Sequence, residues 1–342
     1  MRFHGGNIYQ KSGIHDFSAN INPLGMPDSV RDAIIHSVEK CVHYPDPDCT
    51  ALIQKISEFE RFPVDRIVCG NGAADMIYRI AFAFKPRHAL ICAPTFSEYT
   101  FALQSTGCLI SEYMLDSARG FRLDEQILPM ITNDTDMMIL CTPNNPTGQR
   151  IAPDLLKQIS ECCYQNHTIL VCDECFLRFS ENAEAYSLQQ CFHEYCIILN
   201  AFTKLYAMPG LRLGYALCGS LQNAVLLRQT GQCWSVSVPA QDAGMAALGE
   251  KDWIANTVHY VHTERKYLEK KLRSLGIFAY ESSANFMLIT APENFADEME
   301  KHGILVRRCD DFHNLDSGHF RIAVRTHTEN AALISAINEV YQ

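Results

Sequence analysis

Between residues 66 and 204 the chain repeats one pattern, in which a short apolar run leads into a loop and then into a segment with helical spacing. The apolar runs lie at residues 67–69, 89–93, 108–113, 137–141, 168–172 and 197–199. Helical spacing indicates helices at residues 29–42, 50–59, 76–84 and 153–165. Strands of a parallel sheet are apolar throughout because helices cover both faces of the sheet. The pattern therefore predicts an α/β fold with a mostly parallel sheet covered by helices.

The pattern changes after about residue 223, where a mostly helical stretch extends to residue 275. Short apolar runs that are typical of strands follow at residues 286–289, 304–307 and 319–324. This change predicts a second, smaller α+β domain. We expect three parts, namely an N-terminal arm that packs with the small domain (1–30), a large domain (31–225) and a small C-terminal domain (226–342).

The composition narrows the partners that the protein can have. The chain has 342 residues and a formal net charge of −10, and such an acidic chain is poorly suited to nucleic acid or to an anionic membrane surface. It has no apolar run long enough for a spanning helix and no apolar segment typical of a secretory signal near its start. We therefore expect a cytoplasmic protein that acts on a small molecule, with no nucleic acid and no membrane as partner.

The cysteines are numerous but do not form a metal-binding pattern. The chain has 15 of them, and several lie inside the apolar runs, which is typical of reduced and buried thiols. Cys172 and Cys175 form a C-x-x-C pair, but the sequence has no second pair at metal-binding spacing. We expect no metal site.

Polar residues follow the predicted strands of the large domain. The carboxyl ends of parallel strands share one edge of a sheet, and ligands bind at that edge. The groups in question are Gly70-Asn-Gly-Ala-Ala-Asp75, Pro94-Thr-Phe96, Asn145-Pro-Thr-Gly148, Asp173 and Thr203-Lys204, followed by Arg212 in Gly-Leu-Arg-Leu-Gly. Together they predict a binding site at this edge.

Each group has an ordinary alternative when it is taken alone. The segment after Gly70 either holds a phosphate on the backbone N–H groups of Ala73 and Ala74 or is simply a tight turn. Asp173, as a buried carboxylate, needs a cationic partner, which a protonated pyridine nitrogen or an arginine can supply. Lys204 either forms a Schiff base with an aldehyde cofactor or lies at a loop tip in water.

In their order along the chain, these motifs resemble the fold-type I pyridoxal-phosphate enzymes of the aminotransferase class, over nearly the whole sequence. The resemblance implies a homodimer with shared active sites and pyridoxal 5'-phosphate as the cofactor. It implies that Lys204 is the catalytic residue and carries the cofactor as a Schiff base. The implied cofactor contacts are Asp173 on the pyridine nitrogen, Asn145 on the ring hydroxyl, Phe96 against the ring, Ala73, Ala74, Thr203 and Arg212 on the phosphate, and Tyr44 on the neighbouring subunit's cofactor phosphate.

Within this class the layout resembles two groups, the histidinol-phosphate aminotransferases and the L-threonine-O-3-phosphate decarboxylases of cobalamin synthesis. The segments His4-Gly-Gly-Asn7 and Asp16–Gly25 are similar to the decarboxylase signature. Phe176 stands where these aminotransferases usually have a tyrosine, so it cannot donate a hydrogen bond to the ring oxygen; alternatively, it only packs. The implied substrate contacts are His4, Gly5, Asn20, Asn145, Arg307 and Arg321, with Arg308 as the alternative to its neighbour Arg307.

The resemblance implies decarboxylation of L-threonine O-3-phosphate to (R)-1-aminopropan-2-ol O-2-phosphate and carbon dioxide. The alternatives are a decarboxylase of O-phosphoserine, which lacks one methyl group, and a histidinol-phosphate aminotransferase. A cofactor-binding regulator without activity is a further alternative from a different class. Lys204 serves decarboxylation and transamination alike, so the choice depends on which bond at the substrate's Cα is held perpendicular to the cofactor ring.

Overall fold

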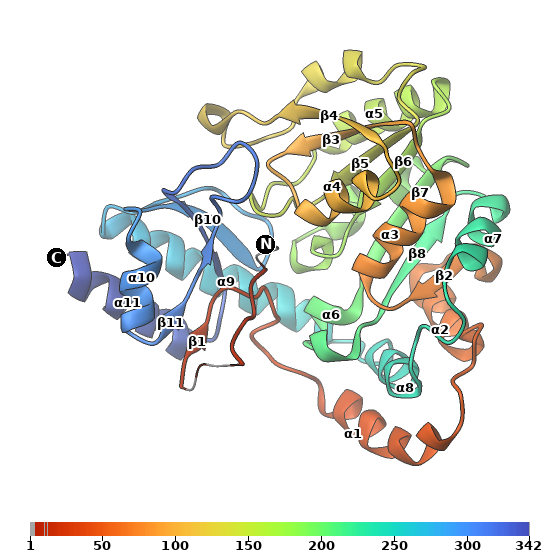
Figure 1. Cartoon of the computed structure of the whole chain (residues 1–342). Coiled ribbons are helices and arrows are strands. Elements are labelled where there is room, and N and C mark those ends of the chain that lie inside the picture. The colour runs from red at the N-terminus through yellow and green to blue at the C-terminus, as the bar shows by residue number, and fades with distance from the viewer. Residues whose placement is uncertain (1–3, 10, 12, 342) are drawn as a thin grey trace.

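The computed structural model describes residues 4–9, 11 and 13–341, and its largest sheet has seven strands in the order β2-β8-β7-β6-β5-β3-β4 (Figure 1). The strands are β2 (Ile67–Gly70), β3 (His88–Ala93), β4 (Leu109–Met114), β5 (Met137–Cys141), β6 (Ile169–Asp173), β7 (Cys196–Ala201) and β8 (Gly214–Cys218). Strand β8 runs antiparallel to β2 and β7, while β7, β6, β5, β3 and β4 pair in parallel. The mostly parallel sheet predicted from the sequence is confirmed.

Helices cover both faces of this sheet. The helices of this part are α1 (Asp28–Ser37), α2 (Thr50–Glu60), α3 (Ala73–Phe84), α4 (Ser97–Gln104), α5 (Pro153–Gln165), α6 (Phe202–Leu205), α7 (Leu221–Thr230) and α8 (Val238–Ala247). Along β3 and β5, successive buried side chains alternate between two hydrophobic clusters: Leu90 and Leu140 belong to one, and Ile91 and Ile139 to the other. Both faces are therefore apolar, which explains the continuous apolar runs in the sequence.

A smaller α+β part follows the large sheet. Its antiparallel sheet has the order β12-β13-β10-β9, and three helices accompany it. The elements are α9 (Trp253–Ser274), β9 (Phe278–Ala279), β10 (Phe286–Thr290), α10 (Phe295–Lys301), β11 (Ile304–Leu305), β12 (Arg307–Arg308), β13 (His319–Ala323) and α11 (His327–Tyr341). Strand β1 (His15–Asp16) pairs in parallel with β11, so the N-terminal segment lies beside this part of the molecule (Figure 1).

The structure differs from the sequence prediction at several places, and the short strands β1 and β9 are among the elements not predicted. Strand β8 was not predicted, because only the single turn of α6 and a short 3₁₀ turn separate it from β7, and its reversed direction leaves no signal in a short apolar run. The predicted run at residues 304–307 divides into β11 and β12, which pair with different strands on either side of Val306. The helix predicted at 29–42 ends as an α-helix at Ser37 and continues as a 3₁₀ turn over Val38–Val42.

Two general features of the described residues bear on the site. Their helices are either too short or too polar to cross a membrane. The fifteen cysteines are free thiols, and most of them are buried.

Candidate active site

A cavity of about 240 Å³ opens where the carboxyl ends of the parallel strands face the smaller sheet. Every residue predicted to touch cofactor or substrate lines it, except Tyr44. Those residues are His4, Gly5, Asn20, Ala73, Ala74, Phe96, Asn145, Asp173, Thr203, Lys204, Arg212, Arg307 and Arg321. The fold thus brings together side chains that lie more than three hundred positions apart in the sequence.

Lys204 lies on α6, a single helical turn that begins directly after β7. Burial, together with the nearby positive charge of Arg321, lowers the pKa of the Lys204 amine to about 8. Both effects disfavour the ammonium form. The amine is therefore uncharged more often near neutral pH than an ordinary lysine, and the uncharged form is the one that attacks an aldehyde.

Asp173 ends β6 and is almost completely buried, with two protein donors in place. The hydroxyl of Tyr99 donates to its Oδ2 at 2.7 Å, and the backbone N–H of Cys175 donates to its Oδ1 at 3.0 Å. Burial raises the pKa of the Tyr99 hydroxyl well above its usual value, and the charge of Asp173 adds to that, so this hydroxyl stays a donor. An ionised carboxylate accepts more than two hydrogen bonds, so Asp173 keeps capacity for a cationic N–H in the cavity.

The N-terminus of α3 and Arg212 form one end of the cavity. Gly72, which precedes the helix, has a positive φ of 85°, and a Cβ atom there would lie 2.6 Å from the Arg212 guanidinium. A Cβ on Gly214 would lie 2.7 Å from the backbone N of Ala73. Only glycine permits this close approach of the helix start, the strand and the arginine. Free N–H groups at a helix start, combined with a guanidinium, favour binding of a phosphate.

Arg321 joins the smaller sheet to the opposite wall of the cavity. One of its terminal nitrogens donates to the Asn145 side-chain oxygen, and the other donates to the Ser18 backbone oxygen at 2.7 Å. Its Nε is buried and has no hydrogen-bond partner among the described residues, as is also the case for Oδ1 of Asn20. Burial lowers the pKa of Arg321 to about 10, and the charge of Arg307 also contributes. A buried guanidinium with an unused N–H is suited to a carboxylate ligand.

Arg307 lies directly opposite Arg321 in the pairing of β12 with β13. It is held by Asp311 at 2.7 Å, and its guanidinium lies 5.1 Å from the ring centre of Phe312. The adjacent Arg308 does not line the cavity and instead pairs with Asp297 at 2.6 Å. Of the two neighbouring arginines, the structure therefore places Arg307 at the cavity.

Two residues near the cavity mouth come from distant segments. The imidazole Nε2 of His4 lies 3.0 Å from Oε1 of Glu98, and the Oε2 of the same carboxylate accepts a hydrogen bond from the Tyr78 hydroxyl. The ring of Phe96 packs edge-on against Tyr99, with 5.6 Å between ring centres, and its centre lies 5.9 Å from that of His4. The ring of Phe96 therefore lines the cavity beside Tyr99, the residue whose hydroxyl donates to Asp173.

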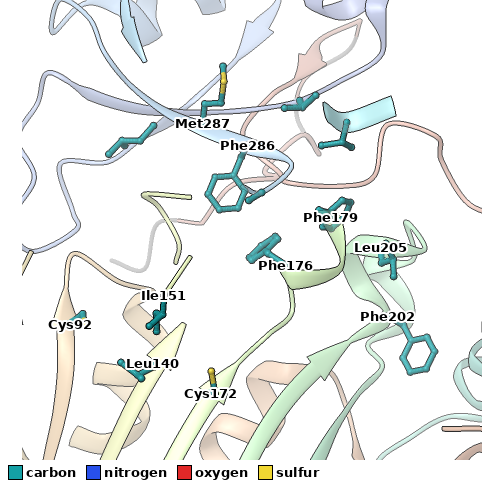
Figure 2. Close-up of a cluster of buried hydrophobic side chains, with 14 of the residues drawn as sticks. Cys92, Leu140, Ile151, Cys172, Phe176, Phe179, Phe202, Leu205, Phe286 and Met287 are labelled. Atoms are coloured by element: carbon teal, nitrogen blue, oxygen red, sulfur yellow. The ribbon is translucent and has the colours of Figure 1, made fainter. Parts of the chain in front are cut away.

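Tyr44 lies outside the cavity, and its side chain is 79% exposed. Its ring stacks on Trp234 with 4.6 Å between ring centres. Phe176 lines the cavity, and its ring also lies against that of Phe286 (Figure 2). The two rings meet at a steep angle with 5.0 Å between their centres. Phe176 therefore both faces the cavity, where a tyrosine hydroxyl could have reached the cofactor ring, and packs in the hydrophobic core.

Sequence reasoning missed several residues of the cavity wall. These are Ser18, Ala19, Ser97, Tyr99, Cys141, Cys175, Ala201 and Phe312. A signal existed for Tyr99, because it lies three residues after Phe96 at the start of a helix and therefore near it in space. The other residues of this list carry no sequence signal, and only the course of the backbone shows that they line the cavity.

The residues present fit the implied cofactor. Pyridoxal phosphate needs an amine, an anion partner for its ring nitrogen, a flat apolar surface and a phosphate cradle. The cavity presents Lys204, Asp173, Phe96 and the Gly72–Arg212 cradle for these four needs. Each of these groups lies on an element whose position the main sheet fixes.

Comparison with known proteins places the chain in a family. The model of the aminotransferase class I and II family matches residues 12–337. A threonine-phosphate decarboxylase from Salmonella typhimurium is 35% identical, over 98% of this chain and 96% of its own length. The adenosylcobalamin biosynthesis bifunctional protein CobDQ of Leptospira interrogans is 32% identical over 99% of this chain and 41% of its own length. The crystal structure of the histidinol-phosphate aminotransferase from Clostridium acetobutylicum superposes with a TM-score of 0.89 at 27% identity, over 95% of this chain and 98% of that one.

The chain therefore belongs to the aminotransferase class I and II family, and it is an enzyme that uses pyridoxal 5'-phosphate. The family resemblance and the fold class predicted from the sequence are both confirmed.

Proposed function

We propose that this enzyme decarboxylates L-threonine O-3-phosphate, giving (R)-1-aminopropan-2-ol O-2-phosphate and carbon dioxide in cobalamin biosynthesis. The observation that carries the proposal is that Arg307 and Arg321, paired across two neighbouring strands, both line the same cavity. A substrate with both a carboxylate and a phosphate on a short carbon chain matches two such cations. The similarity to threonine-phosphate decarboxylase and to an adenosylcobalamin biosynthesis protein supports the same substrate and pathway.

The proposed roles follow from the positions of the side chains. Lys204 holds the cofactor, Asp173 pairs with its ring nitrogen, and the N–H groups of Ala73 and Ala74, with Thr203 and Arg212, hold its phosphate. Phe96 stacks on the ring, and Asn145 donates to the ring oxygen. When bound, pyridoxal phosphate supplies an aldehyde for the substrate amine and a ring that accepts the electron pair of a broken bond at Cα.

The substrate is held at its two charged ends. Arg321, with Asn20, orients the carboxylate so that the bond to Cα is the one that breaks, and Arg307 and His4 hold the phosphate. Once carbon dioxide has left, Lys204 delivers a proton to Cα, because it is an amine in the cavity wall whose pKa of about 8 allows it to give and to take a proton. The apolar walls formed by Phe96, Phe176 and Phe312 limit the access of water.

The proposed contact between Arg307 and the substrate phosphate can be tested by comparing Arg307 with its neighbour Arg308. Arg307→Ala should raise KM for O-phosphothreonine roughly tenfold to a hundredfold, because it removes a charge-assisted contact. Arg308→Ala is the matched control and should leave KM almost unchanged, because Arg308 pairs with Asp297 outside the cavity. Equal effects of the two substitutions would overturn the assignment.

A second candidate is a histidinol-phosphate aminotransferase, which the likeness to the Clostridium acetobutylicum enzyme favours. Histidinol phosphate carries a phosphate but no carboxylate, so it would use only one of the two arginines at a time. The two functions are separated by supplying histidinol phosphate with 2-oxoglutarate and measuring glutamate. A decarboxylase of O-phosphoserine is the closer variant, because one methyl group in an apolar pocket is worth only about 1–3 kcal/mol.

We also propose a homodimer with shared active sites. Tyr44 and Trp234 form an exposed aromatic pair, and the preceding segment exposes large apolar side chains. These are Ile35, Val38 and Val42, with 60%, 63% and 79% exposure. A patch of this kind is typical of a surface that another protein covers. A second copy of the chain on this patch would bring Tyr44 toward the neighbouring cofactor phosphate.

A further inference from the structure

The helical turn that carries Lys204 cannot hold its shape alone. Helix α6 comprises only Phe202–Leu205, and helix nucleation is unfavourable for so short a segment. The last carbonyl groups of a helix have no partner within it, and in a single turn these are most of its carbonyls. The position of the lysine therefore depends on groups outside the turn.

Asn22 donates two of the hydrogen bonds that hold this turn from outside, and the indole N–H of Trp253 donates another, to the carbonyl of Leu205 at 2.9 Å. Its backbone N–H donates to the carbonyl of Lys204 at 3.1 Å, and its Nδ2 donates to the carbonyl of Leu205 at 2.7 Å. The same Nδ2 donates to Oγ1 of Thr257 on α9 at 2.8 Å, and Oδ1 accepts from the N–H of Leu24 at 3.0 Å. Asn22 is only 2% exposed, and its amide makes bonds with both of its ends. A buried and fully paired amide is rigid, because each lost bond leaves an unpaired group.

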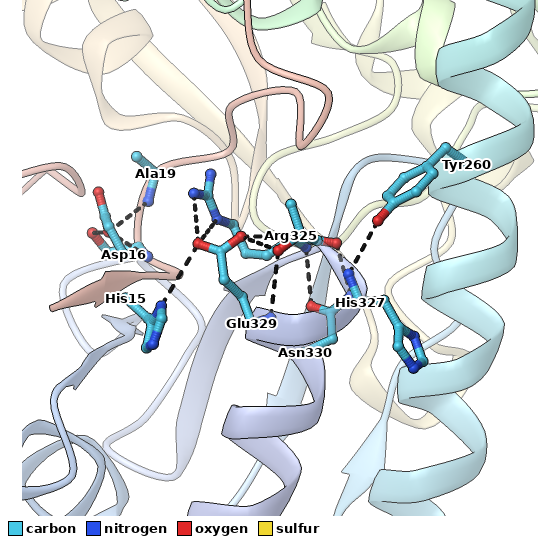
Figure 3. Close-up of polar contacts among 10 residues, drawn as sticks. His15, Asp16, Ala19, Tyr260, Arg325, His327, Glu329 and Asn330 are labelled. Carbon is cyan, nitrogen blue, oxygen red and sulfur yellow. Dashed lines mark hydrogen bonds and ion pairs between the residues drawn. The ribbon is translucent and has the colours of Figure 1, made fainter.

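The same stretch of chain also holds the substrate wall. Four residues before Asn22, the carbonyl of Ser18 accepts a hydrogen bond from Arg321, and between them the carbonyl of Asn20 accepts one from Asn285 at 3.0 Å. The start of the stretch is fixed in turn, because Oδ1 of Asp16 accepts a hydrogen bond from the N–H of Ala19 (Figure 3). The two atoms lie 3.3 Å apart. Residues 18–22 thus form a short bridge between the lysine and the carboxylate-binding arginine.

We propose that Asn22 is a positioning residue for the reaction, which fixes the Lys204 turn and its spacing from Arg321. Asn22 lines no part of the cavity, so it acts through Lys204 and touches neither cofactor nor substrate. The proposal rests on the proposed function in one respect, namely that Lys204 is the lysine that carries the cofactor. It does not depend on which bond of the substrate breaks.

The test compares two buried asparagines, Asn22 and Asn223, which are 2% and 9% exposed. Asn22→Ala removes the side-chain bonds to Leu205, Thr257 and Leu24. Asn223→Ala removes one amide bond, to the carbonyl of Glu194, and neither of these two residues lines the cavity. For both variants, loaded with pyridoxal phosphate, we would measure the thermal midpoint, the pH midpoint of the cofactor's visible absorbance, and kcat. A misplaced lysine should lower kcat roughly tenfold to a hundredfold and shift the absorbance midpoint by about half a pH unit or more.

The expected result is that both variants lose thermal stability but only Asn22→Ala shifts the absorbance midpoint and lowers kcat. Equal absorbance midpoints and equal kcat in Asn22→Ala and Asn223→Ala would overturn the proposal. Should Asn22→Ala fail to fold, Asn22→Ser is measured in its place, because a serine hydroxyl can still accept from the N–H two residues on. Lys204→Ala tests the cofactor-carrying role of Lys204 separately from the positioning role of Asn22. If the cofactor absorbance of Lys204→Ala matches that of the wild type, the proposed function has the wrong lysine, whatever the Asn22 variants show.

Discussion

The hydroxyl of Tyr99 lies 2.7 Å from Oδ2 of Asp173, and this pair joins the first turns of α4 to the end of β6 at the base of the cavity. Both side chains are buried, and a buried carboxylate is stable only when donors surround it. Tyr99 is therefore expected to stabilise the charged Asp173 that the cofactor's ring nitrogen needs.

Tyr99→Phe should weaken cofactor binding without unfolding the protein, because it removes one hydrogen bond and little volume. Hydrogen bonds to charged groups contribute about 1.5–3 kcal/mol, so the dissociation constant of pyridoxal phosphate should rise roughly tenfold to a hundredfold. Equilibrium titration of the apoprotein, followed by fluorescence, measures this constant. Tyr113→Phe is the control, because it removes a tyrosine–aspartate bond, to Asp124, outside the cavity. Similar constants for the two variants would contradict the role of Tyr99.

The pH dependence of cofactor uptake should report the lowered pKa of Lys204. Only the uncharged amine attacks the aldehyde, and burial together with Arg321 lowers the pKa of this amine to about 8. The rate of uptake by the apoprotein should therefore rise with pH and level off above about 8, well below the ordinary range of lysine. Arg321→Met removes a neighbouring positive charge and should move this midpoint upward. A midpoint above 10 in the wild type would contradict the account.

Glu174 should make stability fall as pH rises through neutrality. Burial raises the pKa of Glu174 to about 7, and the charge of Glu60 adds to that. A carboxyl group whose pKa is raised on folding binds its proton more tightly in the folded state. The protonated carboxyl therefore contributes roughly 3 kcal/mol to the free energy of unfolding below about pH 4.5. This contribution is lost as the pH rises from 4.5 through about 7.

Glu174→Gln should remove this dependence, since glutamine does not ionise. Urea unfolding between about pH 5 and pH 8 gives the free energy of unfolding for both proteins. The wild type should lose more stability over this interval than the variant. The exposed Glu184→Gln should behave like the wild type, and a wild-type curve parallel to that of Glu174→Gln would show that Glu174 is ionised throughout.

Val42→Glu should weaken the proposed dimer. The substitution places a charge in the apolar patch beside Tyr44, where a partner copy would have to bury it. Light scattering after gel filtration should show a dimer for the wild type at micromolar concentration and a shift toward monomer for the variant. Val64→Glu, at a valine that is 42% exposed elsewhere, should stay dimeric. A monomeric wild type would exclude the shared site that Tyr44 implies.

The sequence was informative where local chemistry dictates structure. Continuous apolar runs specify strands covered on both faces, so six strands of the large sheet could be predicted, together with the polar groups after them. Lys204 and Asp173 were identified because a strand end is a specific place in an α/β fold. Strand β8 was missed because a reversal of strand direction leaves no signal in a short apolar run.

The long-range pairings were beyond the reach of sequence patterns. The contacts of Asn22 with Leu205, and of Arg321 with Asn145, join segments separated by 183 and 176 positions. They depend on how the N-terminal segment crosses between the two sheets, and periodicity does not encode that path. Likewise, the choice of Arg307 over Arg308 follows from the pairing register of β12 with β13, which a run of two arginines does not reveal.

The most direct test of the proposed reaction is to follow the carboxyl carbon of the substrate. Purified enzyme with pyridoxal phosphate is incubated with O-phosphothreonine labelled with ¹³C in its carboxyl group, without any keto acid, and labelled carbon dioxide and 1-aminopropan-2-ol phosphate are measured. The account predicts that the two products appear in equal amounts over many turnovers. Glutamate formation from histidinol phosphate and 2-oxoglutarate, with no labelled carbon dioxide from phosphothreonine, would contradict it.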